Sequence, residues 1–124
     1  MTEIPAARLR ALRGATTVDA DTSEQISGRT AELLIEMLRR NELPIEDIVS
    51  VILSATRDLH SDFPAVAARA IGLSHTPLLC CLEIPVDGAV ERCIRVLMHC
   101  YPPGGPIHHV YLHGARQLRT DLPE

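Results

Sequence analysis

The chain has 124 residues and a mass of 13.6 kDa, the size of one ordinary domain. Its 12 basic and 16 acidic residues give a formal net charge of -4, which argues against a broad basic surface for nucleic acid. All 12 basic residues are arginines, so Schiff-base and Walker-type lysines are excluded. With no tryptophan and only three other aromatic residues, the chain has almost nothing on which single-stranded bases could stack.

The sequence carries no pattern typical of secretion or membrane insertion. Its first residues hold no uninterrupted apolar run, and no segment approaches the roughly 18 apolar residues of a membrane span. The four cysteines are therefore expected to be reduced thiols: Cys80, Cys81, Cys93 and Cys100. We expect a cytoplasmic protein with no membrane partner.

The first predicted elements are a strand and a long helix. Residues 8–18 alternate in polarity and are interrupted by Gly14, which predicts a strand that ends near a glycine turn or bulge. Period-two alternation places Leu9, Ala11 and Arg13 on one of its faces. Residues 22–25 have the form of a capping box, in which Gln25 returns a bond to the backbone of the cap residue. A helix to about Asn41 follows, with Glu36 and Arg40 as an i,i+4 pair and an apolar stripe of Ile26, Leu33, Leu34, Met37 and Leu38.

A second strand and helix are predicted in the middle of the chain. Residues 44–47 suggest a short helical turn, and the branched apolar run 48–55 predicts a buried strand. A second helix is expected from about Asp62 to Gly72. Arg69 falls outside its apolar stripe and should be exposed unless another chain covers it; the expected stripe is Phe63, Val66, Ala67, Ala70 and Ile71.

The last third of the chain predicts three more strands. Residues 77–86 read as a strand, and residues 108–112 as another. Residues 91–101 fit either a helix or a strand, but the preceding Asp-Gly turn and the branched residues favour a strand. The resulting order is β-α-β-α-β-β-β, an α+β domain with a mixed sheet.

Three charged residues interrupt apolar strands and are candidates for a polar pocket. Glu83 and Arg95 lie within otherwise apolar runs, and Arg13 ends the face of the first strand. A charge in a strand is costly to bury without a partner, so each residue is either exposed or paired. Both alternatives remain open for each residue taken singly, but the three together favour a pocket.

Metal and nucleophile chemistry have weaker support. The histidines and cysteines at 80, 81, 108, 109 and 113 form no CxxC, HxxxH or HExxH spacing, which disfavours a zinc site. No nucleophile-elbow pattern surrounds Ser54 or the cysteines. From the residues alone, the sequence predicts an α+β domain with arginines near a possible pocket.

Four segments, in this order, resemble the AroH-type chorismate mutases over about residues 8–122: RALRGATTV (10–18), LSATRDLHSDFPAVAAR (53–69), PLLCCLEIPVDGAVERCIRVLMH (77–99) and HHVYLHGARQLRTDL (108–122). The resemblance implies that residues 1–124 form a single chorismate mutase domain. It also implies a mixed sheet with helices on one side, assembled as a homotrimeric pseudo-α/β-barrel with active sites between subunits. The implied reaction is the rearrangement of chorismate to prephenate in phenylalanine and tyrosine biosynthesis, without any cofactor or metal.

The resemblance also assigns roles to individual residues. Arg13 matches an arginine that binds a substrate carboxylate, and Arg95 matches the one at the breaking ether oxygen. Glu83 and Cys80 match the pair at the ring hydroxyl, and Tyr111 matches a carboxylate-binding tyrosine.

Other matching residues lie at the edges of the implied site. Phe63 and Arg69 match residues contributed by the neighbouring subunit, which accounts for an exposed Arg69. Leu118 and Arg119 match a C-terminal segment that closes over the site. Val66 departs from the family, because relatives commonly have a lysine there.

Three other interpretations of the function remain as alternatives. A non-catalytic trimeric module could bind a carboxylate metabolite through the same arginines. A trimeric imine deaminase of the RidA type also binds carboxylates through an arginine, but the order of the motifs does not support it. A zinc protein ranks last.

Overall fold

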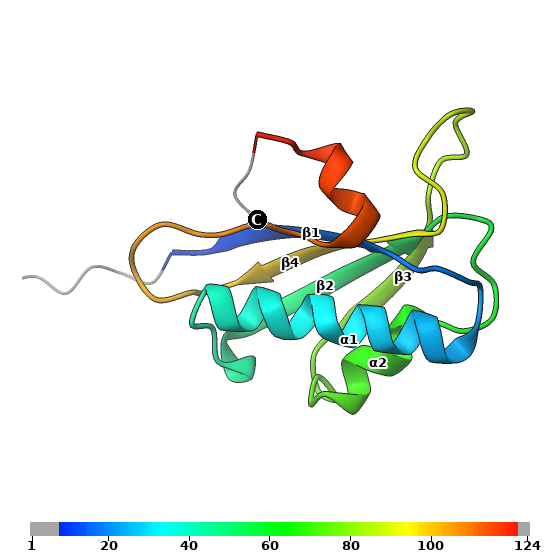
Figure 1. The fold of residues 1–124 in the computed structure, drawn as a ribbon. Helices are drawn as coiled ribbons and strands as arrows, with labels where there is room; N and C mark the ends of the chain where they lie inside the picture. Colours follow the sequence, from blue (N-terminus) through cyan, green and yellow to red (C-terminus); the bar gives the residue numbers. More distant parts are fainter. Residues whose placement is uncertain (1–7, 122–124) are drawn as a thin grey trace, which may run out of the picture.

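The computed structural model describes residues 8–121 as one mixed sheet covered by helices (Figure 1). The elements in chain order are β1 (Arg10–Thr17), α1 (Ser23–Arg40), η1 (Ile45–Asp47), β2 (Ile48–Ala55), α2 (Pro64–Ala70), β3 (Leu78–Leu82), β4 (Cys93–Cys100), β5 (Val110–Tyr111) and η2 (His113–Leu118). The sheet order is β3-β2-β4-β1-β5. β4 is antiparallel to β1 and β2, whereas β1–β5 and β2–β3 are parallel. The predicted α+β class is confirmed.

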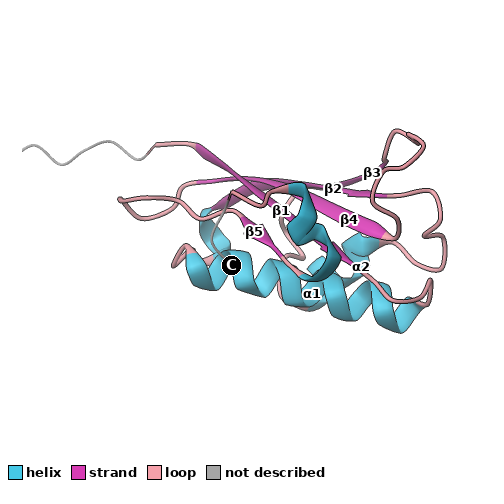
Figure 2. Cartoon of the chain, turned by 45° about the horizontal axis from the view of Figure 1, so that its top comes forward, coloured by secondary structure: helices cyan, strands magenta, loops and turns pink. Residues whose placement is uncertain are grey.

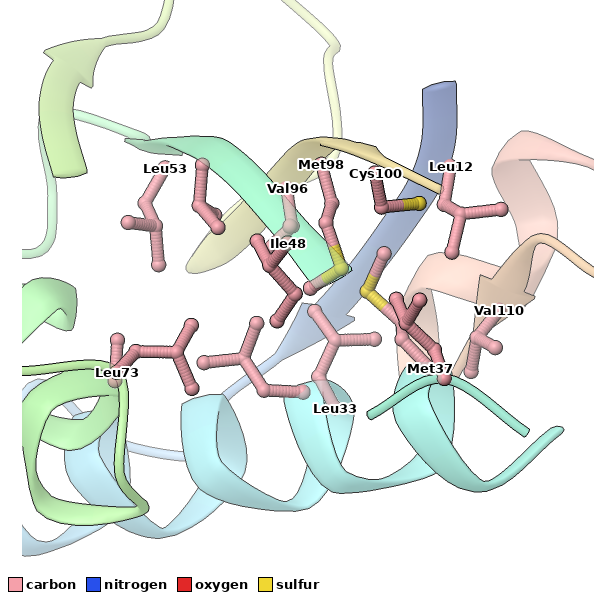
Figure 3. Packing of buried hydrophobic residues seen from close by; sticks show 14 of the residues in the cluster. Leu12, Leu33, Met37, Ile48, Leu53, Leu73, Val96, Met98, Cys100 and Val110 are labelled. Carbon is pink, nitrogen blue, oxygen red and sulfur yellow. The ribbon is translucent and has the colours of Figure 1, made fainter. Parts of the chain in front are cut away.

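Both α-helices cover the same face of the sheet, and the core lies between them and the strands (Figures 1 and 2). Figure 3 shows Leu33 and Met37 of α1 pointing towards Leu12 and Met98 of the sheet. Gly14 lets α1 approach β1, because a Cβ there would lie 2.5 Å from the Met37 sulfur. The predicted apolar stripe of α1 is confirmed.

The start of α1 follows the prediction only in part. The Thr22 hydroxyl accepts the expected bond from the Gln25 backbone N–H at 3.1 Å. The Gln25 side chain instead accepts from the Asp19 N–H, because the Thr22 N–H already bonds Ala20. Near the other end, Glu36 and Arg40 form the predicted ion pair at 2.8 Å.

The predicted apolar stripe of α2 is wrong for three of its five residues, while Ala67 is buried and Ile71 packs half-buried against the core as predicted. Its buried face consists of Pro64, Ala65, Ala67 and Ala68. Phe63 is 69% exposed, and Val66 and Ala70 are also exposed. The small residues face inward because they allow the short helix to pack closely. Gly72 ends the helix as predicted, with φ +117°.

The strand predictions hold in type but not in length. β3 ends at Leu82, short of the predicted residue 86, and β5 has only two residues. Residues 93–100 form a strand, which resolves the helix-or-strand ambiguity. The sequence did not predict η2. Within residues 8–121, no helix has the length and apolar character required to cross a bilayer.

The sheet face opposite the helices is only partly covered. Residues 48–55 were predicted to form a buried strand, but Val49 is exposed and Ile52 and Ser54 are half-buried, because the helices cover only one face of β2. Edge strand β3 and the loop after it also expose apolar side chains: Leu79, Leu82, Ile84 and Val86.

Candidate active site

A pocket of about 240 Å³ lies at the helix-free face of the sheet. Its polar lining brings together Arg13 of β1, Arg95 of β4, Tyr111 of β5 and Glu83 just after β3, and it also includes Gly14, Ile52, Ser54, Val96 and Leu97. Alternation along each strand explains this arrangement, since the neighbours Leu12, Val96 and Val110 point into the core.

Strand register sets the spacing of the pocket residues. Arg95 lies opposite Ser54 of β2 on one side and Ala15 of β1 on the other. Ala15 in turn lies beside Tyr111 of β5. Four neighbouring strands, β2, β4, β1 and β5, therefore present Ser54, Arg95, Ala15 and Tyr111 on the same face.

Glu83 is held in place by backbone and side-chain contacts. Its N–H donates to the Ala55 carbonyl at 2.9 Å, and its carboxylate accepts a hydrogen bond from the Ser54 hydroxyl. The Arg95 Nε lies 3.5 Å from the other carboxylate oxygen. The Glu83 side chain is 24% exposed and the Arg95 side chain 48%, so the guanidinium keeps a free edge towards solvent. No pattern in the sequence marks Ser54 as the residue that anchors Glu83.

The backbone of Arg13 is bonded by a side chain, that of His109, which no sequence pattern placed at the site. Its N–H donates to Nδ1 of His109 at 2.9 Å. Burial, together with the charges of Arg13, Arg119 and Arg10, lowers the pKa of His109. A lowered pKa favours the neutral imidazole, the form in which Nδ1 can accept a bond.

The segment after η2 brings a further arginine towards the site. Arg119 donates from Nε and Nη2 to the carboxylate of Asp121, at 3.0 and 2.9 Å. These bonds, together with backbone contacts and the charge of Arg13, hold the pKa of Asp121 at about 2. Arg119 also interacts with Tyr111. Leu118 is half-buried at the end of η2.

Cys80 and Phe63 line a different pocket of about 410 Å³, between α2, β2 and β3. Cys80 pairs with the core residue Leu53 and packs against the core, on the helix side of the sheet. Glu83 is three positions further along an extended chain, so it points to the opposite face. One chain therefore does not bring Cys80 and Glu83 into the same pocket.

Arg69 is exposed on α2, as the sequence predicted, and lines neither of these two pockets. All four cysteines are free thiols, and burial raises the pKa of the Cys93 thiol beside the pocket. In residues 8–121, no group of three or more His, Cys, Asp or Glu side chains is arranged to hold a metal ion.

An anchored carboxylate among several arginines, on the open face of an α+β sheet, defines a protein suited to a small polycarboxylate ligand. The chain belongs to the chorismate mutase type I family, whose model matches residues 9–122.

Two curated relatives are both described as chorismate mutase AroH. The Bacillus subtilis protein is 44% identical over 117 residues, which is 92% of each chain. The Thermus thermophilus protein is 46% identical over 117 residues, covering 92% of this chain and 96% of that protein. A solved chorismate mutase from Clostridium thermocellum superposes with a TM-score of 0.84 at 46% identity, covering 87% of this chain and 98% of that one. The recognised family is therefore confirmed.

Proposed function

We propose that this chain is a chorismate mutase that rearranges chorismate to prephenate. The observation that carries the proposal is the convergence of Arg13, Arg95, Glu83 and Tyr111 on one pocket. Membership of the family and the names of the relatives support the same reaction.

The chemistry suits a pocket of fixed charges. This Claisen rearrangement is unimolecular, so it requires no nucleophile, general base or cofactor. The protein must hold a dianionic substrate in a compact conformer with its reacting carbons close together. In this proposal Arg13 and Tyr111 hold carboxylates of the substrate, because a guanidinium and a phenol both donate hydrogen bonds.

Arg95 has the central role in this mechanism. Negative charge develops on the ether oxygen as its bond to carbon breaks, and a fixed guanidinium stabilises that charge more in the transition state than in the ground state. The contact between Glu83 and the Arg95 Nε orients the guanidinium and leaves its other N–H groups for the substrate. A free oxygen lone pair of Glu83 can also accept a bond from the ring hydroxyl.

The complete site is proposed to form between subunits of a homotrimer. The family assigns Cys80 and Glu83 to one substrate hydroxyl, yet the two residues line different pockets of a single chain. A second copy that placed its Phe63–Cys80 pocket against the arginine pocket would unite them. The exposed side chains of Phe63, Leu82 and Ile84 are 69%, 66% and 82% accessible, and they provide apolar surface for such contacts.

Two further assignments belong to this proposal. Arg119 and Leu118 would close the site from the C-terminal side, an assignment supported by the interaction between Arg119 and Tyr111. The cytoplasm is the proposed location, because the product serves phenylalanine and tyrosine synthesis and the four free thiols suit a reducing compartment.

The test follows the decrease in chorismate absorbance after purified protein is added in the presence of EDTA. We expect Arg95→Ala to lower kcat/KM by about 100-fold or more, the typical cost of removing a donor to a developing oxyanion. Arg95→Lys should recover little, because an ammonium does not reproduce the guanidinium fork. The matched control is Arg39→Ala, which removes an exposed arginine that also pairs with a carboxylate.

Full activity in Arg95→Ala would overturn the assigned role. Chorismate that raises the melting temperature of the wild-type protein without being consumed would favour the non-catalytic binding module.

A further inference from the structure

We propose that His109 is a positioning residue, whose imidazole Nδ1 fixes the backbone at Arg13 and thereby aims the Arg13 guanidinium at the substrate. This inference rests on the proposed role of Arg13 in binding a substrate carboxylate. It adds to that function a residue that does not touch the substrate.

The backbone of β1 shows why Arg13 requires an acceptor. Successive residues of a strand point their N–H and C=O groups to alternate sides. Ala15 directs its carbonyl towards β5, where it accepts from the Leu112 N–H at 2.9 Å. Arg13 lies two residues earlier and directs its N–H to the same side.

The regular pairing between β1 and β5 starts one residue after Arg13, so no backbone carbonyl of β5 accepts the Arg13 N–H. That pairing covers only Gly14–Val110 and Ala15–Tyr111. His109 precedes this short ladder, and its side-chain Nδ1 accepts from the Arg13 N–H at 2.9 Å. The imidazole therefore extends the hydrogen bonding of the parallel pair by one position, at the residue that carries the functional guanidinium.

The surroundings of His109 favour the form that can accept. A protonated imidazole has N–H donors at both nitrogens and could not bond the Arg13 N–H. Partial burial and three cations, Arg13 and Arg10 of β1 and Arg119 after η2, all disfavour the extra proton. The same cluster of arginines that suits a dianionic substrate thus maintains the acceptor.

The effect should appear in substrate binding more than in the chemical step. A carboxylate contact is made equally in the ground state and the transition state, so its loss raises KM and leaves kcat nearly unchanged. A misplaced Arg13 should therefore raise KM for chorismate by about three- to tenfold, the range expected for one lost hydrogen bond.

The experiment compares His109→Asn and His109→Gln by steady-state kinetics and thermal melting. The Asn carbonyl oxygen can occupy roughly the position of Nδ1, whereas the longer Gln side chain places its oxygen near the position of Nε2. We expect His109→Asn to keep KM within about twofold of the wild type. His109→Gln and His109→Ala should each raise KM by about three- to tenfold.

The matched control is His108→Ala. The exposed neighbour His108 contacts Asn41 through its backbone N–H and carbonyl, which alanine retains. This variant should keep the wild-type KM. A general disturbance of the loop before β5 would instead raise KM in both histidine variants.

A double variant separates positioning from stability. If His109 acts through Arg13, adding His109→Gln to Arg13→Ala should raise KM no further, although the melting temperature still falls. An additional rise in KM, or a His109→Gln variant with wild-type KM, would overturn the inference. If Arg13→Ala alone leaves KM unchanged, the role proposed for Arg13 fails and the inference fails with it.

Discussion

The ion pair between Arg119 and Asp121 places an internal carboxylate on the arginine that is proposed to close the site. Asp121 accepts two bonds from the Arg119 guanidinium, the geometry that a substrate carboxylate would adopt. A substrate that used Arg119 would have to displace Asp121 first. Because the Asp121 side chain is 66% exposed, solvent screens the ion pair and that displacement should cost little.

We expect Asp121→Asn to lower KM for chorismate by up to about fivefold, because Arg119 no longer has to exchange one carboxylate for another. Steady-state kinetics at low ionic strength is the measurement, since salt screens exposed charge pairs. The control is Glu91→Gln, which neutralises an exposed carboxylate paired with Arg92 outside the arginine pocket. A higher KM in Asp121→Asn would show instead that Asp121 holds Arg119 in its working position.

At the scale of single residues, the sequence predicted the members of the site better than their supports. Glu83, Arg95 and Arg13 stood out as charges in apolar strands, and the structure places them in one pocket. Ser54 and His109 were missed because their roles depend on contacts between residues 29 and 96 positions apart in the chain. No local pattern signals such contacts.

Two glycines, one on the open side of α1 and one in β1 beneath that helix, are expected to respond in opposite ways to substitution by alanine. Gly28 lies within α1, and a Cβ there would meet nothing within 4 Å. Gly14 lies in β1, where a Cβ would meet the Met37 sulfur at 2.5 Å and a Leu33 methyl at 3.2 Å. Met37 and Leu33 are fully buried, so neither side chain can swing into open space.

We therefore expect Gly28→Ala to raise the free energy of unfolding by about 0.5–1 kcal/mol, through better helix propensity. Gly14→Ala should lower it by about 1 kcal/mol or more, because an overpacked core must rearrange. Denaturant unfolding of both variants is the measurement. Equal effects of the two substitutions would mean that α1 does not approach β1 as closely as the structure indicates.

At the scale of elements, predictions succeeded where the local signal and the tertiary contacts agree. The apolar stripe of α1 recurs at helical spacing over 18 residues, so the buried face of this helix could be predicted from the sequence. α2 has only seven residues, five of them alanine or proline, and its large side chains point away from the core. A short helix with small residues has no dominant stripe, which explains the wrong prediction.

The whole molecule has one sheet face packed on helices and one face left partly uncovered. Exposed apolar side chains along β3 and the following loop are costly for an isolated chain. The sequence indicated this only indirectly, through Arg69, which falls outside the apolar stripe predicted for the second helix. The apolar surface and the separation of Cys80 from Glu83 both become reasonable if a second copy covers this face.

A shared site makes a quantitative prediction for mixed assemblies. We expect Arg95→Ala to damage the arginine pocket of one subunit, and Arg69→Ala to damage the surface that its neighbour contributes. Each variant alone should lose most of its activity. Co-refolding the two in equal amounts should restore about a quarter of the sites, because in a closed ring one site in four pairs an intact pocket with an intact neighbour.

The matched control for this recovery mixes Arg95→Ala with Arg13→Ala. Both lesions lie in the same pocket of a chain, so no pairing of subunits can restore an intact site and the mixture should remain as inactive as its components. An affinity tag on one variant of each pair, which must retain the untagged variant on capture, confirms that mixed assemblies have formed. If Arg95→Ala and Arg69→Ala formed mixed trimers without regaining activity, each chain would carry its own complete site, and the exposed apolar face would serve assembly alone.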